Sequence, residues 1–139
     1  MKKALRWMAD TNVLSELIRN PQGPLVQHML TIDMSGFCTS IVVACEMRYG
    51  AQRRGSAALQ AKVEELLNSL PVLPLDADAD KHYADIRTEL EAAGTPIGGH
   101  DLFIAAHARA SGLTLVTRNT REFTRVRALL VEDWMAARS

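Results

Sequence analysis

Apolar residues in this chain alternate between short continuous runs and longer runs with helical spacing. The short runs predict strands at residues 5–9, 36–39, 72–75, 113–117 and 128–131. Apolar side chains recur every three or four positions in the longer segments, which predict helices at 11–19, 25–32, 41–53, 57–70, 77–93 and 102–110, with a helical turn at 121–125. Ser40 stands directly before the third helix and is expected to cap it.

The alternation of strands and helices predicts an α/β fold. Strands that are separated by helices pair in parallel through right-handed crossovers, so we expect one mostly parallel central sheet of about five strands with helices on both faces. The 139 residues fit a single domain spanning residues 1–139. In such sheets the functional crevice lies outside the carboxyl ends of the strands.

Polar side chains fall at that expected edge of the sheet. Asp10 follows the first predicted strand, and Glu46 lies in the second turn of the helix after the second strand. Asp101 begins a helix after a glycine-containing loop, while Asn119 and Glu122 follow the fourth strand. These side chains can therefore converge although they are far apart in the chain.

Two of these acids stand in strongly apolar surroundings. Glu46 lies within IVVACEM, and LFIAAHA follows Asp101. A helix that is apolar on all sides is normally buried, and a buried carboxylate is costly unless it is paired. Several carboxylates in one pocket also repel each other, and a divalent cation resolves both problems; oxygen ligands of this kind suit Mg²⁺, with Mn²⁺ as a substitute.

Each of these residues also has a purely structural explanation. Asp10 and Asp101 are good helix caps, and Glu46 could lie on a partly exposed face near Arg48. Glu122 could be solvated, and Asn119 could be a turn residue. Their combination at one sheet edge is what favours a metal site.

Overall charge excludes one simple mode of nucleic-acid binding. Sixteen Lys and Arg balance sixteen Asp and Glu, so binding through bulk positive charge is not expected. The basic residues are nevertheless uneven: Arg48 follows Glu46, and Arg118 and Arg121 flank the fourth strand. An acidic metal pocket with an arginine rim suits a phosphodiester substrate.

Composition also bears on the compartment. The two cysteines are too few for a disulfide scaffold or a four-cysteine zinc site, and they fit a reducing, cytoplasmic setting. We find neither a signal peptide nor an apolar run long enough to span a bilayer, so no membrane association is expected.

Four segments resemble the PIN-domain ribonucleases of the VapC toxin type, from type II toxin–antitoxin systems. They are ADTNVLSELIR, SIVVACEMRYGAQ, GTPIGGHDLFIAAHARASGLTLVTRNTREF and VEDW, and the likeness covers a core of about residues 8–134. The resemblance implies a Mg²⁺- or Mn²⁺-dependent endoribonuclease that cuts structured RNA such as tRNA. It also implies a homodimer, neutralised by a VapB-like antitoxin whose C-terminal segment lies across the active groove.

Matched residue by residue, Asp10, Glu46 and Asp101 stand at the three core acids of that family. The resemblance places further polar positions around these acids at Thr11, Asn12, Ser40 and Thr117. Many PIN domains carry a fourth acid where this chain has Asn119, so Glu122 becomes a candidate accessory ligand and the number of metals stays open.

Rival functions remain at this point. A catalytically weak PIN-like module that binds RNA or protein is supported by Asn119 alone, and a metal site by itself does not distinguish RNA from DNA. A phosphoacceptor signalling domain would need a paired acid after the first strand and a lysine after the last, where this chain has only Asp10 and Trp134.

Overall fold

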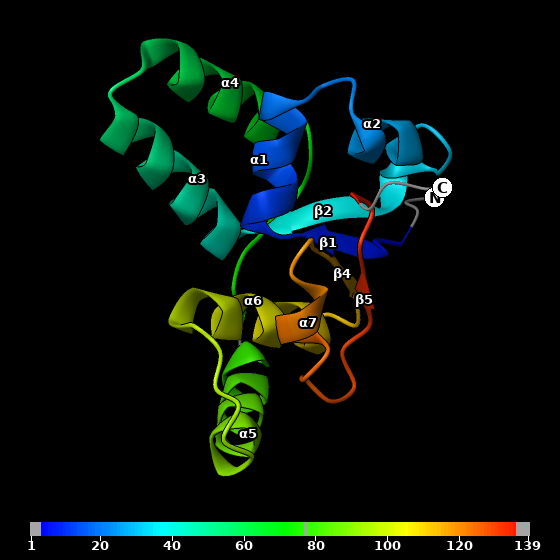
Figure 1. Cartoon of the computed structure of the whole chain (residues 1–139), viewed down its shortest axis with the longest axis vertical. Coiled ribbons are helices and arrows are strands. Elements are labelled where there is room, and N and C mark those ends of the chain that lie inside the picture. The colour runs from blue at the N-terminus through cyan, green and yellow to red at the C-terminus, as the bar shows by residue number, and fades with distance from the viewer. Residues whose placement is uncertain (1–3, 77, 136–139) are drawn as a thin grey trace.

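The five strands form one parallel sheet in the order β3-β2-β1-β4-β5. This computed structural model describes residues 4–76 and 78–135 (Figure 1). The strands are β1 (Trp7–Ala9), β2 (Phe37–Ser40), β3 (Val72–Leu73), β4 (Thr114–Val116) and β5 (Val131–Glu132). The predicted α/β architecture with a parallel five-stranded sheet is thus confirmed.

Helices cover both faces of the sheet, as expected. On one side lie α1 (Thr11–Arg19), α2 (Pro24–Met29), α3 (Ile41–Arg54) and α4 (Ala57–Asn68). On the other side lie α5 (Ala79–Ala92), α6 (Gly99–Ala110) and α7 (Thr120–Phe123) (Figure 1). A short 3-10 helix, η1 (Met34–Gly36), leads into β2. The predicted start of the fifth helix at residue 77 lies outside the described residues.

The first and fourth strands are shorter than predicted, and the third and fifth are shortened or displaced for reasons that lie in the backbone. The third strand stops at Leu73, because Pro74 follows and offers no N–H for the ladder. The last strand was expected at 128–131 but lies at Val131–Glu132, because Ala128 has a positive φ of 62° that interrupts an extended chain.

The helix that carries Asp101 also begins earlier than the sequence predicts. It starts at Gly99 with Gly98 as its cap, so Asp101 lies inside the first turn rather than before it. Ser40, in contrast, caps α3 as predicted, since its Oγ accepts a hydrogen bond from the Val42 N–H at 3.0 Å.

The strand order reverses between β1 and β4. The chain passes from β1 to β2 and β3 on one side, then crosses back to β4 and β5 on the other. The register aligns Ala9 with both Thr39 and Val116, so the carboxyl ends of the three central strands are level. Parallel α/β sheets bind ligands at such a reversal, which here is where Asp10 and Thr117 follow their strands.

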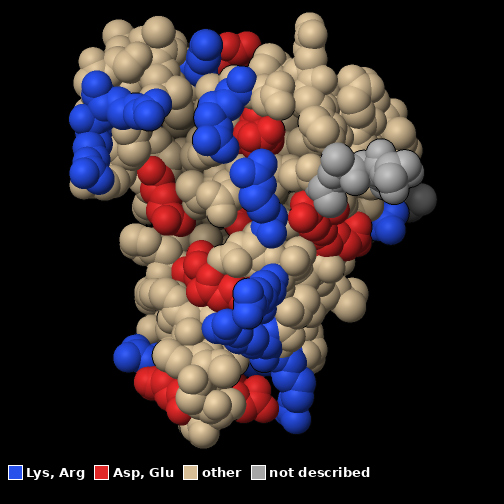
Figure 2. Space-filling model, in the orientation of Figure 1, with Lys and Arg blue, Asp and Glu red and all other residues tan. Residues whose placement is uncertain are grey.

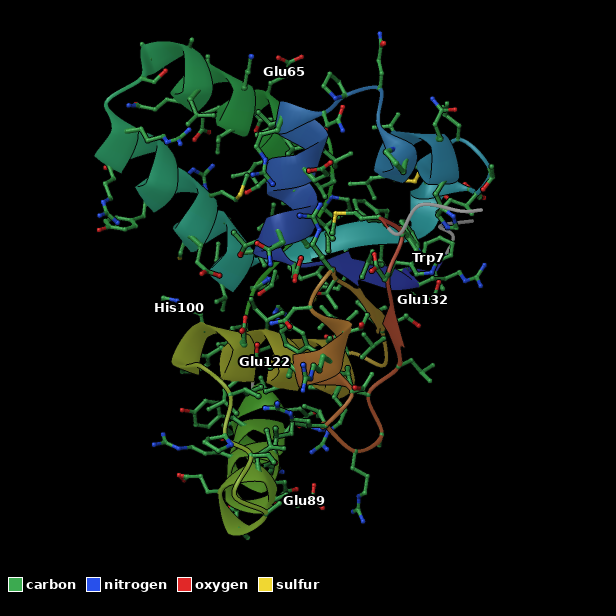
Figure 3. The ribbon with its side chains drawn as sticks, in the orientation of Figure 1. Trp7, Glu65, Glu89, His100, Glu122 and Glu132 are labelled. Carbon is green, nitrogen blue, oxygen red and sulfur yellow. The ribbon has the colours of Figure 1, made fainter. Side chains whose placement is uncertain are left out.

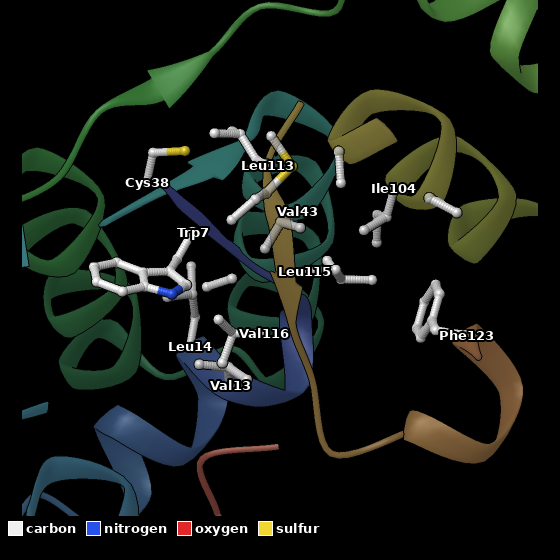
Figure 4. Packing of buried hydrophobic residues seen from close by; sticks show 14 of the residues in the cluster. Trp7, Val13, Leu14, Cys38, Val43, Ile104, Leu113, Leu115, Val116 and Phe123 are labelled. Carbon is white, nitrogen blue, oxygen red and sulfur yellow. The ribbon is translucent and has the colours of Figure 1, made fainter. Parts of the chain in front are cut away.

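The core is mainly aliphatic and lies on both faces of the sheet. Consecutive residues of β4 point to opposite sides: Leu115 faces Ile104 and Phe123, while Val116 faces Val13 and Leu14 (Figure 4). Aromatic rings add to this core, since Trp134 packs edge-on against Trp7 of β1 at 5.4 Å between centroids. Packing on both faces of the sheet therefore fixes the positions of the strand ends. None of the helices in the described residues is long and apolar enough to cross a membrane.

Candidate active site

Asp10 is the most firmly held side chain at the carboxyl ends of the strands. It caps α1, with Oδ1 accepting from the Val13 N–H at 3.0 Å, and it accepts a further backbone hydrogen bond from Asn12. Its other oxygen, Oδ2, accepts from the Thr117 hydroxyl at 2.5 Å. Burial raises the pKa of Asp10, and the hydrogen bonds from Thr117 and Val13 oppose that shift. The capping role and the proposed site role therefore coexist in one residue.

Glu46 reaches the same edge from α3. Its Oε1 accepts a 2.7 Å hydrogen bond from the hydroxyl of Thr11, the residue after Asp10. Its Oε2 lies 3.2 Å from Nδ1 of His100, at the start of α6. The Glu46 side chain is 25% exposed, so it faces a pocket rather than the core or open solvent.

Asp101 reaches the site from α6. Burial raises its pKa to about 6, with further contributions from the negative charges of Glu122, Asp10 and Glu46 in that order, and with His100 opposing them. No hydrogen-bond donor in residues 4–76 and 78–135 is found on the Asp101 carboxylate. The charges of Asp10 and Glu46, from two distant segments, thus both act on Asp101.

The end of β4 supplies a second acidic element. The side-chain amide of Asn119 donates to Oε2 of Glu122, and Oε1 of Glu122 lies 3.4 Å from the Gly98 N–H. Thr117 Oγ1 accepts from the Asn119 N–H at 2.9 Å, which joins this element to Asp10. Figure 3 shows Glu122 and His100 at the same side of the molecule, on α7 and at the start of α6. Glu122 therefore belongs to the acidic cluster, and Asn119 orients it.

Other predicted site residues lie elsewhere or contribute differently. Ser40 was expected among the polar groups around the acids, but its side chain is fully buried and bonds His107 at 2.7 Å instead. Asn12 has an exposed side chain and reaches Asp10 through its backbone N–H. His107 is buried, as its apolar helix predicted.

The three arginines of the predicted rim differ in their partners. Arg118 lies 3.5 Å from Oε1 of Glu16 on α1, beside Thr117. Arg121 is exposed on α7, next to Glu122. Arg48 is bound on α3 by Glu64 of α4, at 2.7 and 3.1 Å. In Figure 2, acidic side chains across the middle of the visible face are interspersed with basic ones, and further basic side chains lie above and below them.

Glu16 and His100 were not among the predicted site residues. Glu16 lies among apolar residues on α1, and its position in the sequence does not indicate a role in the site. Its side chain is nevertheless only 13% exposed and forms an ion pair with Arg118. His100 was signalled only by its position next to Asp101, and the fold brings it to Glu46.

The acidic cluster fits a divalent cation in chemistry, although its side chains are not arranged as a finished ligand set. No group of three His, Cys, Asp or Glu side chains in the described part of the chain is close enough to hold a metal ion. The donor set consists of hard carboxylate oxygens, which suit Mg²⁺ or Mn²⁺ with several retained waters. The mutual repulsion that raises the pKa of Asp101 is what a bound cation would relieve.

A groove of about 310 Å³ is lined by α1, α3 and α4. Thr11 and Glu46 connect it to the acidic cluster, and Arg19 and Arg54 also line it. Apolar side chains form much of its remaining wall, namely Ile18, Met47, Ala51, Leu59 and Val63. The candidate site therefore opens into a partly apolar channel.

Comparison with known proteins agrees with this geometry. The PIN domain family matches residues 8–129. The tRNA(fMet)-specific endonuclease VapC of Shigella flexneri is 39% identical over 131 residues, covering 94% of this chain and 98% of that protein. Ribonuclease VapC2 of Haemophilus influenzae is 35% identical over 133 residues, covering 94% of this chain and 99% of that protein.

Among solved structures, DNA-bound VapBC from Salmonella typhimurium contains a similar chain. It superposes with a TM-score of 0.84 at 37% identity, over 94% of this chain and 98% of that one. Fold, strand-end chemistry and full-length similarity agree, and this chain belongs to the PIN-domain family, among the VapC ribonucleases.

Proposed function

We propose that this protein is the Mg²⁺-dependent endoribonuclease toxin of a toxin–antitoxin pair and that it hydrolyses phosphodiester bonds in structured RNA such as tRNA. The observation that carries the proposal is the convergence of Asp10, Glu46, Asp101 and Glu122 at the strand reversal, where Thr117 and Thr11 hydrogen-bond two of these acids and the other three raise the pKa of Asp101. The relatives named as endonucleases or ribonucleases VapC support the same reaction class.

Each side chain has a distinct task in this proposal. Asp10 and Asp101 would ligate the metal directly, and Glu46 would do so directly or through water. Thr117 and Thr11 orient these carboxylates, because their hydroxyls donate to Asp10 and Glu46. Glu122, oriented by Asn119, is the accessory acid. A bound Mg²⁺ or Mn²⁺ would supply Lewis acidity and a water of lowered pKa for attack on phosphorus.

The arginine rim is proposed to hold the RNA backbone. Arg118 and Arg121 lie next to the acidic cluster and would bind phosphates on either side of the cut bond. Arg48 is included with a smaller contribution, because Glu64 binds its guanidinium at 2.7 and 3.1 Å, closer than the 3.5 Å between Arg118 and Glu16. No side chain is required as a nucleophile.

The proposed partner is a VapB-like antitoxin. The similar chain from Salmonella typhimurium comes from a VapBC complex. The groove along α1, α3 and α4 offers apolar walls, and Glu46 within it is the group that would pair with a basic side chain from such a partner. A homodimer in the cytoplasm is the expected state of the active toxin.

The decisive experiment incubates the purified protein with total cellular RNA, with and without Mg²⁺, and sequences the cut ends. We expect discrete cuts that need the metal and carry 5′-phosphate and 3′-hydroxyl ends. Asp101→Asn should reduce cleavage by roughly a thousandfold, because the metal contributes several kcal/mol of transition-state stabilisation. Asp85→Asn, which changes an exposed acid on α5, is the matched control and should leave cleavage unchanged.

The same experiment distinguishes the alternative function. A catalytically weak binding module would bind RNA or a protein partner but produce no metal-dependent cuts. Cutting that survives in Asp101→Asn would contradict the assignment of the acids. Single-stranded DNA in a parallel reaction shows whether the sugar matters, since a metal-bound phosphate alone does not recognise it.

A further inference from the structure

Two polar contacts connect α3, which carries Glu46, with α6, which carries Asp101. The outer contact joins His100 Nδ1 to Glu46 Oε2 at 3.2 Å, and the His100 side chain is 74% exposed. The inner contact joins Ser40 Oγ to His107 Nδ1 at 2.7 Å, and both residues are almost completely buried. Exposed pairs are weak, whereas breaking a buried hydrogen bond leaves a polar group without water, so the inner contact is the stronger constraint.

The directions of the hydrogen bonds in the inner contact can be assigned. Ser40 Oγ already accepts from the Val42 N–H, so its own hydroxyl proton is free to donate to His107 Nδ1. A backbone hydrogen bond to Pro74 opposes the burial that lowers the pKa of His107, and because Nδ1 faces Ser40 we assign the ring proton to Nε2, toward the Pro74 carbonyl. Donors and acceptors therefore alternate along one chain from Pro74 through His107 and Ser40 to Val42.

This chain of hydrogen bonds fixes three elements relative to one another. Ser40 caps α3, six residues before Glu46, and it pairs with Leu73 of β3 in the sheet. His107 lies in the interior of α6, six residues after Asp101. Among the described residues, no buried side-chain nitrogen or oxygen lacks a hydrogen-bond partner, so the network is complete.

We propose that Ser40 and His107 are positioning residues that set the separation of Glu46 and Asp101 and thereby the affinity of the site for its divalent cation. The inference rests on the proposed metal site. Neither residue touches the substrate or the metal. Their effect passes through the two helices, in the way that residues behind a metal ligand fix its orientation.

The two amide replacements of His107 separate the link to Ser40 from the link to Pro74. In His107→Asn the amide oxygen stands where Nδ1 stood and can still accept from Ser40. In His107→Gln the amide nitrogen stands where Nε2 stood, so the Pro74 link survives and the Ser40 link is lost. We expect His107→Gln to bind Mn²⁺ about tenfold more weakly than the wild type, and His107→Asn to bind it nearly as well.

Ser40 provides the same test from the other side. Ser40→Ala removes the link together with a helix cap, while Ser40→Thr keeps a hydroxyl in place. Ser56→Ala is the matched control, because Ser56 caps α4 through the Leu59 N–H at 3.2 Å and caps neither α3 nor α6. Ser40→Ala should weaken Mn²⁺ binding about tenfold, and Ser56→Ala and Ser40→Thr should not.

The measurement is Mn²⁺ titration of the folded protein by calorimetry, with the thermal midpoint recorded for each variant. The double variant Ser40→Ala with His107→Gln should bind Mn²⁺ no more weakly than the weaker-binding single variant. Both substitutions remove the same hydrogen bond, so their effects do not add. Equal Mn²⁺ affinities for His107→Asn and His107→Gln, with only the thermal midpoint lowered, would overturn the inference. Should His107→Gln fail to fold, Ser40→Ala against Ser56→Ala decides by the same criterion.

Failure of the proposed function gives a different result. If the wild type binds no Mn²⁺, or binds it equally well after Asp101→Asn, the metal site itself is absent. If the wild type binds Mn²⁺ through Asp101 and the Ser40 and His107 variants bind it equally well, only the positioning role is lost.

Discussion

Asp10 and Asp101 belong to one acidic cluster, but the protein holds them in opposite ways. Asp10 ends the central strand and accepts hydrogen bonds from Asn12, Val13 and Thr117. Asp101 lies on α6, across the cluster, where burial and neighbouring negative charges raise its pKa to about 6. Asp10 is therefore part of the structural framework, while Asp101 is held mainly by its helix.

This difference means that the two acids affect folding stability and metal binding to different extents. A carboxylate that caps a helix and bonds a buried hydroxyl contributes to folding as well as to the site. A carboxylate that is repelled by its neighbours costs stability while it is charged, and it becomes favourable only with a cation. We expect the Asp10 side of the site to be rigid without metal and the Asp101 side to respond to it.

The largest expected effect is on folding stability at Asp10. Asp10→Ala removes the cap of α1 and leaves the buried Thr117 hydroxyl without its acceptor, which should cost about 2–4 kcal/mol. Asp101→Ala should leave the metal-free stability at pH 7 unchanged or slightly higher, because it removes repulsion. Urea unfolding of the metal-free proteins measures both values. Equal losses in the two variants would mean that the proposed division of roles is wrong.

A substitution of Thr117 tests the hydrogen bonds that hold Asp10 without removing a charge. Thr117→Val deletes the hydroxyl that donates to Asp10 and accepts from the Asn119 N–H, and should cost about 1–3 kcal/mol. Thr114→Val, on the strand that precedes Thr117, is the matched control, because Thr114 is only partly buried and makes its sheet contacts through the backbone. A loss in Thr117→Val no larger than in Thr114→Val would remove Thr117 from the framework.

Much of this arrangement could be predicted from the sequence. The strand-then-acid pattern located Asp10, and the apolar neighbourhoods of Glu46 and Asp101 indicated acids that need a partner. The end of the chain was placed wrongly, because the positive φ of Ala128 depends on tertiary packing that no local pattern reveals. Ser40 was correctly predicted as a cap, but its turn toward His107 depends on a contact between residues 67 positions apart.

The start of α6 shows a second limit of sequence reasoning. Gly98 and Gly99 are typical of a loop, so Asp101 was expected at the boundary, whereas the helix begins at Gly99. Low helix propensity was overridden there by the packing of Leu102 and Ile104 in the core. The residue types of the site could therefore be predicted, but the partner of each side chain could not.

The dependence of stability on pH should include a contribution from Asp101 that a single substitution isolates. Its pKa is raised from 3.8 to about 6 in the folded protein, so the folded state binds the proton more tightly than the unfolded state. Its contribution to stability is therefore present below pH 3.8 and is lost as the pH rises toward 6 and above. Asp10 shifts in the same direction.

The contribution of Asp101 should appear as a difference in melting temperature between the metal-free wild type and Asp101→Asn. The two should melt alike near pH 4, and the variant should gain a few degrees over the wild type by pH 7. Mn²⁺ should raise the melting temperature of the wild type at pH 7 and have little effect at pH 4, where the carboxyl is protonated. Parallel curves across this range would contradict a raised pKa at Asp101.

The smallest expected effect is the difference in RNA binding between the exposed arginine on α7, Arg121, and the paired arginine on α3, Arg48. Arg121 is exposed next to Glu122, so Arg121→Ala should weaken RNA binding and reduce the slope of its salt dependence by about one unit. Arg48 is held by Glu64, so Arg48→Ala should leave that slope nearly unchanged and shift the melting temperature only slightly. Binding is measured in an Asp101→Asn background without divalent cations, since this variant is expected to leave the RNA intact. Equal reductions of the slope in both variants would mean that Arg48 leaves Glu64 to bind phosphate, and would extend the basic rim along α3.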